Sequence, residues 1–191
     1  MPSDMIGQGA EILLGFVVIP LWLAAGLCDY VCHRASAIER TSGTPESILH
    51  LIQFGLVGLP IVAALFLAVK AGLLLAFILF ILLHHAVAFA DVRYANHMRV
   101  VTPVEQMVHS FLEILPITAF LLIGALHFGQ LTALFGGGNE VAQWMPRPKP
   151  HPLPVWYSAS VLAGAFVLNF LPYSEELVRC LRASGPATRA V

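Results

Sequence analysis

Long apolar segments constrain this chain more than any other feature. The hydrocarbon core of a bilayer is about 30 Å thick, and an α-helix needs about 20 mostly apolar residues to cross it. Five segments of the sequence meet this requirement. The predicted spans are about 9–33, 47–69, 71–97, 103–128 and 155–171.

The composition agrees with this interpretation. Hydrophobic residues make up 58% of the 191 residues and charged residues only 11%, whereas a soluble domain is about 25% charged. So few charges cannot cover a water-exposed surface, which excludes a soluble enzyme and a disordered chain. The net charge of −1 offers no basic surface for nucleic acid. We therefore expect an all-α integral membrane protein with one polytopic domain over residues 1–191.

The links between the spans indicate how the helices pack. Short links favour antiparallel neighbours, so the first four spans are predicted to form an antiparallel bundle. The link over residues 129–154 is longer and contains three consecutive glycines, followed by proline at every second position from 146 to 154. Alternating proline favours an extended stretch, so this link is predicted to be an extracytoplasmic loop. Residues 183–191 are predicted to form a flexible C-terminal tail.

The basic residues predict the orientation, because cytoplasmic loops carry an excess of Lys and Arg. One side of the predicted membrane has seven such residues and the other has three. The seven are Arg34, Arg40, Arg93, Arg99, Arg179, Arg182 and Arg189, and the three are Lys70, Arg147 and Lys149. We therefore expect the N-terminus outside and the C-terminus in the cytoplasm, in a bacterial-type inner membrane or a plasma membrane.

Acids and histidines gather at one end of the first four predicted helices. Three helices carry an acid and a histidine four residues apart, and the remaining helix carries a histidine and an acid seven apart. These residues are Asp29 and His33, Glu46 and His50, Glu105 and His109 with Glu113 after them, and His84 and Asp91. Residues four or seven apart share a helix face. Because the helices alternate in direction, all four sets are predicted at the cytoplasmic end.

Buried acids at this depth need a compensating charge, because each costs several kcal/mol unless it is paired or ligated. The nearby arginines are predicted closer to the rim, so two divalent metal ions are the better compensation. Carboxylate oxygen and imidazole nitrogen suit iron, manganese or zinc. The predicted metal ligands are Asp29, His33, Glu46, His50, His84, Asp91, Glu105, His109 and Glu113. Glu46, His50, Asp91, Glu105 and His109 are the best-placed five of these.

Several alternatives stay open at this stage. A single acid–histidine pair at a helix end is often a simple salt bridge, and a group of such pairs also suits a proton site. The sequence does not decide whether His84 or His85 faces the site, or whether Glu39, Cys28 or Cys32 takes part. Four charged residues after the last span are predicted to lie at the membrane interface. They are Glu175, Glu176, Arg179 and Arg182.

In architecture, this arrangement resembles the membrane-bound di-iron carboxylate proteins. Soluble di-iron bundles take carboxylates from all four helices, with a histidine following a glutamate on two of them. The resemblance covers about residues 29–113. It departs from the soluble bundles in the spacing, which is four residues here and three there. It also lacks the H-x-x-H-H clusters of membrane desaturases and hydroxylases. The resemblance implies two divalent ions, with iron expected and manganese or zinc as alternatives.

Three functions follow from these residues. The leading one is an integral-membrane non-haem di-metal oxidoreductase or oxygenase that uses dioxygen or peroxide on a lipophilic substrate, such as a lipid, an isoprenoid or a quinol. No flavin or nicotinamide fingerprint is present, so a separate protein would donate electrons. The alternative is a divalent metal-ion carrier, although the outer halves of the first four spans are almost purely apolar. The third is a b-type haem protein, which would not require five nearby acids.

Overall fold

The computed structural model describes residues 2–184. Five helices in this part of the chain are long and apolar enough to cross a membrane. They cover Met5–Ala35, Gly43–Phe66, Ala71–Met98, Pro103–Leu126 and Val155–Ala183. The protein is therefore an all-helical chain with the character of a membrane protein.

The first and last of these helices are each interrupted by a π-helical segment. The first consists of α1 (Pro2–Leu13), η1 (Leu14–Val18) and α2 (Ile19–Ala35). The last consists of α7 (Val155–Ala165), η3 (Phe166–Phe170) and α8 (Leu171–Ala183). A proline, Pro20 or Pro172, lies two residues after the end of each π segment. Proline removes one backbone donor and crowds the preceding turn, and the wider π turn accommodates this without ending the helix.

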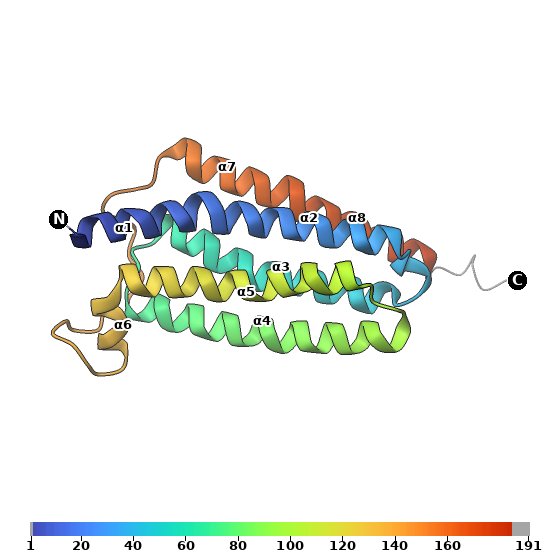
Figure 1. Cartoon of the computed structure of the whole chain (residues 1–191), viewed down its shortest axis with the longest axis horizontal. Helices are drawn as coiled ribbons and strands as arrows, with labels where there is room; N and C mark the ends of the chain where they lie inside the picture. Colours follow the sequence, from blue (N-terminus) through green and yellow to red (C-terminus); the bar gives the residue numbers. More distant parts are fainter. Residues whose placement is uncertain (1, 185–191) are drawn as a thin grey trace, which may run out of the picture.

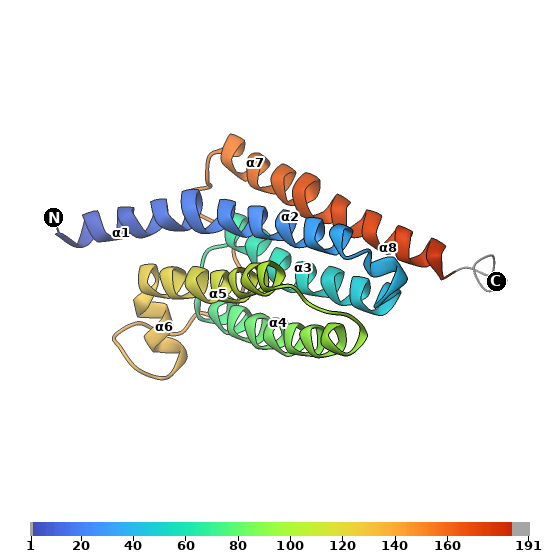
Figure 2. The same cartoon turned by 45° about the vertical axis from the view of Figure 1, so that its right-hand side comes forward.

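The other helices are α3 (Gly43–Phe66), α4 (Ala71–Met98), α5 (Pro103–Leu126) and the short α6 (Phe128–Leu134), and a 3₁₀ turn, η2 (Ile38–Arg40), precedes α3. The long helices lie side by side along the long axis of the molecule (Figures 1 and 2). Helix α3 packs against α4 and α8, and α2 packs against α5. The final helix is therefore a full member of the helical assembly.

The assembly has two distinct ends. We call the end that carries the turns at 36–42 and 99–102 the polar end, on the right of Figure 1. The opposite end, which carries the turn at 67–70 and the segment 127–154, is called the loop end. Between them lies an apolar core built on Val18, Trp22, Leu23, Val57 and Leu115.

The segment 129–154 is fixed to the helices at the loop end. Leu67 forms an isolated antiparallel bridge with Pro148, and the Lys149 amide donates to the Phe66 carbonyl at 2.9 Å. Gly72 allows a close approach here, because a Cβ atom at this position would lie 2.3 Å from the Trp144 carbonyl oxygen. The segment thus folds back over the connection between α3 and α4.

The last long helix extends beyond the predicted span. The prediction ended near residue 171, whereas α8 continues to Ala183 and so reaches the polar end. This extension brings Glu176, one of the four charged residues predicted at the membrane interface, to the site described below. Of the predicted C-terminal tail, residues 185–191 lie outside the described part of the chain.

Candidate metal centre

The predicted ligands gather in the interior of the polar end. Seven of the nine are buried, namely Asp29, His33, Glu46, His50, His84, Asp91 and Glu105. His109 and Glu113 are partly buried. Most of them fall into two groups, each centred on one histidine.

The first group is centred on His33, near the end of α2. Its Nε2 lies 3.4 Å from Asp29 Oδ1 and 3.5 Å from Glu105 Oε1. His109 Nε2, from α5, lies 3.0 Å from the same oxygen of Asp29. We call these four residues the His33 group. The two helices that provide them, α2 and α5, pack directly against each other.

The second group is centred on His50, in the second turn of α3. Its Nε2 lies 3.3 Å from Asp91 Oδ2 and 3.9 Å from Glu46 Oε1. Gln53 donates to the same oxygen of Asp91 at 2.9 Å and so orients that carboxylate. We call Glu46, His50 and Asp91 the His50 group. Both groups contain the acid–histidine pair, four residues apart, that the helical period places on one face.

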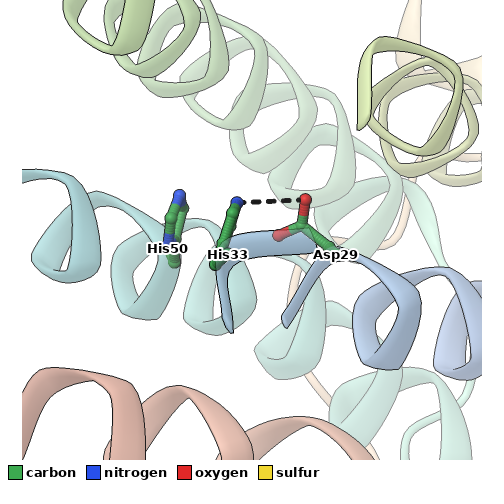
Figure 3. A group of neighbouring side chains, drawn as sticks. All are labelled: Asp29, His33 and His50. Carbon is green, nitrogen blue, oxygen red and sulfur yellow. Dashed lines mark ion pairs between the residues drawn. The ribbon is translucent and has the colours of Figure 1, made fainter. Parts of the chain in front are cut away.

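The two groups are joined by Glu176, which was predicted to lie at the membrane interface. Glu176, on α8, is fully buried, and its two oxygens lie 3.0 Å from His33 Nδ1 and 2.8 Å from His50 Nδ1. The prediction of an interfacial Glu176 is therefore wrong. The two imidazole rings stack with centroids 4.1 Å apart and planes 11° from parallel, as Figure 3 shows beside Asp29. One carboxylate thus holds both histidines.

This contact decides which nitrogen of each histidine is free. An ionised carboxylate only accepts hydrogen bonds, so Nδ1 of both rings carries the proton and donates to Glu176. In the neutral ring Nε2 is then a bare acceptor. The nearest polar neighbours of these Nε2 atoms are carboxylate oxygens, which are acceptors as well. With both rings neutral, the centre therefore places each Nε2 acceptor opposite a carboxylate that can only accept as well.

Five buried ligand atoms of the two groups have no hydrogen-bond partner among the described residues. They are Nε2 of His33, His50 and His109 and Oδ1 of Asp29 and Asp91. Two donor atoms bound to one ion at about 2.1 Å, at tetrahedral or octahedral angles, lie about 3.0–3.4 Å apart. The separations of 3.0, 3.3 and 3.4 Å fall in that range and that of 3.5 Å lies just above it, whereas the 3.9 Å between His50 and Glu46 lies outside it. The residues therefore fit metal ligation in both chemistry and spacing.

Arg99 is the one cation inside the described centre. Its side chain is only 3% exposed, and it donates to both oxygens of Glu46 and of Glu105, including a bond of 2.5 Å to Glu46. Burial opposes its charge, but the bonds to the two carboxylates outweigh this and raise the pKa of Arg99. The prediction that the arginines stay near the rim is wrong for Arg99. Arg99 thus holds Glu105 of the His33 group beside Glu46 of the His50 group.

The charge balance still favours additional cations. Five carboxylates of the centre are buried, those of Asp29, Glu46, Asp91, Glu105 and Glu176. With neutral histidines and one guanidinium, four negative charges remain uncompensated in a medium of low dielectric constant. Two divalent ions would balance them.

The remaining predicted ligands lie beside the two groups. His84 is buried, and neither ring nitrogen has a hydrogen-bond partner of good geometry in the described chain. Glu113 lines the same small polar pocket as His84, and neither residue belongs to the clusters of close-lying ligand atoms found in residues 2–184. His85 instead hydrogen-bonds the Ile81 carbonyl of its own helix. Glu39 pairs with Arg179, and Cys28 is exposed.

An apolar cavity of about 430 Å³ occupies the interior between this centre and the loop end. Its walls come from all five long helices, and its polar-end wall contains Trp22, Val57 and His84. The same three residues also line the small polar pocket that contains Asp29, His50, Asp91 and His109. These three residues, which we call the partition, therefore separate the cavity from the candidate metal centre.

Tyr173 and Glu176 were the functional residues that sequence reasoning missed. Tyr173 donates to Asp29 Oδ2 at 3.1 Å. The buried face of α8 consists of Tyr173, Glu176 and Cys180, spaced three and four residues apart as one helix face requires. That period was the available signal, although two adjacent glutamates and two arginines masked it.

The centre combines carboxylate and imidazole donors with three side chains that hydrogen-bond them and fix their orientation, those of Gln53, Tyr173 and Glu176. This donor set suits non-haem iron, manganese or zinc. No family model, no curated protein and no solved structure matches this chain.

Proposed function

We propose that this protein is an integral-membrane non-haem di-metal oxidoreductase that acts on a lipophilic molecule. The His33 group would hold one ion and the His50 group the other. Bound iron or manganese would supply the redox chemistry with dioxygen or peroxide, and a separate protein would donate electrons. The carrying observation is the cluster of unpaired acceptor atoms, because two facing groups of buried acceptors need a cation between them.

The protein's own residues would hold this centre in order. Glu176 keeps the proton of both histidines on Nδ1 and leaves both Nε2 atoms free, as outer-layer carboxylates do for ligating histidines. Tyr173 and Gln53 hold Asp29 and Asp91 in place. Arg99 stays protonated and limits the repulsion between Glu46 and Glu105. The apolar walls beyond the partition keep water away.

The cavity favours an enzyme over a divalent-ion carrier. A carrier needs polar groups along a path between both sides of the membrane. Between His84 and the loop end, the cavity is lined by apolar and aromatic side chains, apart from Glu11, His127 and Lys149 near the loop end. Such a space suits a hydrocarbon chain and offers an ion no ligands. A haem between His33 and His50 is also disfavoured, because their rings stack at 4.1 Å.

For the orientation, we propose that the polar end faces the cytoplasm, on the basis of the seven-to-three distribution of Lys and Arg. Reporter fusions after Lys70 and after Val191 test this. The fusion after Val191 should report the cytoplasm and the fusion after Lys70 the outside. A cytoplasmic signal after Lys70 would reverse the orientation and move the centre to the outer face.

Metal analysis of the purified protein tests the function most directly. We expect two ions per chain in the wild type and about one in His33→Ala or His50→Ala. His97→Ala is the matched control, because His97 lies at the same end but is exposed and bonds only its own helix. A wild-type protein that binds no divalent metal, even after reconstitution with Fe(II), Mn(II) and Zn(II), would refute the proposal.

A further inference from the structure

The walls of the apolar cavity are exposed at one end and buried at the other. Near the loop end its walls include exposed residues, among them Ile12, Phe16 and Trp156. Toward the polar end its walls are buried and end at the partition, where Val57 is 8% and His84 3% exposed. A ligand would therefore enter near the loop end and extend toward the candidate metal centre.

The size of the cavity suits a single extended chain. His84 lies thirteen residues beyond Ala71, the first residue of α4, which corresponds to about 20 Å along the helix. One leaflet of a bilayer contributes about half of a 30 Å core. A volume of about 430 Å³ lies within the roughly 300–1,000 Å³ of small-molecule sites. The space is therefore as long as one lipid chain and too small for much more.

A cation lies at the mouth of this cavity. The Lys149 side chain lines the cavity at its loop end and is half-buried, and its backbone is fixed to the Phe66 carbonyl at 2.9 Å. No acid lies within ion-pair distance of its ammonium group among the described residues. His127 lines the same end, and Glu11 lines it from an exposed position. Glu11 acts on the Lys149 charge only from beyond ion-pair distance, and a half-buried cation without an ion pair favours an anionic ligand group.

The other end of the cavity also has an unsatisfied group. His84 is buried in the partition without a hydrogen-bond partner of good geometry, and it lines both the cavity and the polar pocket. The end of a chain that reached His84 would therefore lie beside the pocket that contains Asp29, His50 and His109.

We infer that the cavity binds a long-chain carboxylate, with its headgroup at Lys149 and its methyl end against the partition at His84. This inference rests on the proposed function for its consequence, which is that the carbon nearest the metals is remote from the headgroup. The binding itself does not depend on metal. A carboxylate is the anionic headgroup that one ammonium group matches with the least bulk.

The test measures binding and orientation separately from metal content. Purified protein in nanodiscs of neutral two-chain lipid is titrated with palmitate, both as isolated and after metal removal. In parallel, a palmitate with a diazirine at its methyl end is photo-crosslinked, and the labelled residues are mapped. We expect labelling at Trp22, Val57 or Leu115, and equal palmitate affinity with and without metal.

Two variant pairs sharpen the test. Lys149→Met should weaken palmitate binding about threefold to fivefold, whereas Lys70→Met, at the same end but outside the cavity lining, should leave it unchanged. Ala119→Trp fills the cavity and should weaken binding by roughly tenfold or more. Ala125→Trp on the same helix faces outward and is its control.

The possible outcomes separate this inference from the proposed function. Saturable palmitate binding by a protein that takes up no divalent metal would support the cavity assignment and refute the proposed oxidoreductase function. Two bound metals with no palmitate binding would overturn this inference alone. Tight binding of hexadecanol or a neutral quinol, unaffected by Lys149→Met, would overturn the anionic headgroup. Crosslinks at Leu153 or Tyr157 would overturn the orientation.

Discussion

The polar end and the loop-end half of this protein are built from the same five helices, yet they differ in almost every physical property. At the polar end, five buried carboxylates, three histidines and one arginine lie within a few ångströms of each other. In the other half, the same helices enclose an apolar cavity. The comparison shows that a membrane helix can carry buried acids when its neighbours provide partners at the same depth. Among the described residues, the buried carboxylates and histidines are thereby confined to the polar end and the partition.

Metal removal should produce the largest difference in stability between the polar end and the loop-end half. The polar end would be left with four uncompensated negative charges, so it should lose stability while the apolar half keeps its packing. A ligand present at about a thousand times its Kd contributes about 4 kcal/mol, which corresponds to a melting temperature lower by about 10 °C for a chain of this size. Thermal melting in detergent before and after chelation measures the shift.

The control for this experiment is the double variant His33→Ala/His50→Ala treated with the same chelator, which should show no further change. An unchanged melting curve for the wild type, after verified metal loss, would mean that Arg99 and protonated histidines already compensate the acids. The centre would then be a salt-bridge network.

Replacement of one histidine in each half tests the comparison at single residues. His109→Ala removes the nitrogen that lies 3.0 Å from Asp29 Oδ1, and we expect loss of about one metal ion per chain and of activity. His127→Ala removes a histidine at the loop end, far from the proposed ligands, and should keep both metals. Metal analysis and an oxygen-consumption assay read out the pair. A His109→Ala protein with full metal and wild-type turnover would contradict the proposed site at its centre.

The smallest effect is expected for the group that orients the ligands. Glu176→Gln keeps the shape but can accept from only one of the two Nδ1–H groups through its single oxygen, so one ring loses its fixed tautomer. Loss of such an outer-layer partner lowers metal affinity about 10–100-fold. The neighbouring Glu175→Gln changes an exposed residue that pairs with Arg34, and it should leave the affinity unchanged. Competition with a metal-binding dye measures both, and equal affinities in the two variants would remove Glu176 from the centre.

The local parts of this structure could be predicted from sequence, since they depend on residues close together in the chain. The apolar runs are long enough to cross a membrane, and five such helices are present. The spacing of Asp29 and His33, and of Glu46 and His50, puts each pair on one helix face. In the structure each of these pairs does converge, with separations of 3.4 and 3.9 Å. Whether these residues hold metal stays a prediction.

Contacts between distant segments were decided by the tertiary structure alone. Glu176 reaches His33 across 143 residues of sequence and His50 across 126. That contact requires the last helix to extend to Ala183 and to turn one particular face toward α2 and α3. Arg99 likewise looks like an ordinary basic residue after a helix, and only the approach of α3 and α5 buries it between Glu46 and Glu105. Helical period fixes which residues share a face, but helix packing fixes which faces meet, and that depends on side chains far apart in the chain.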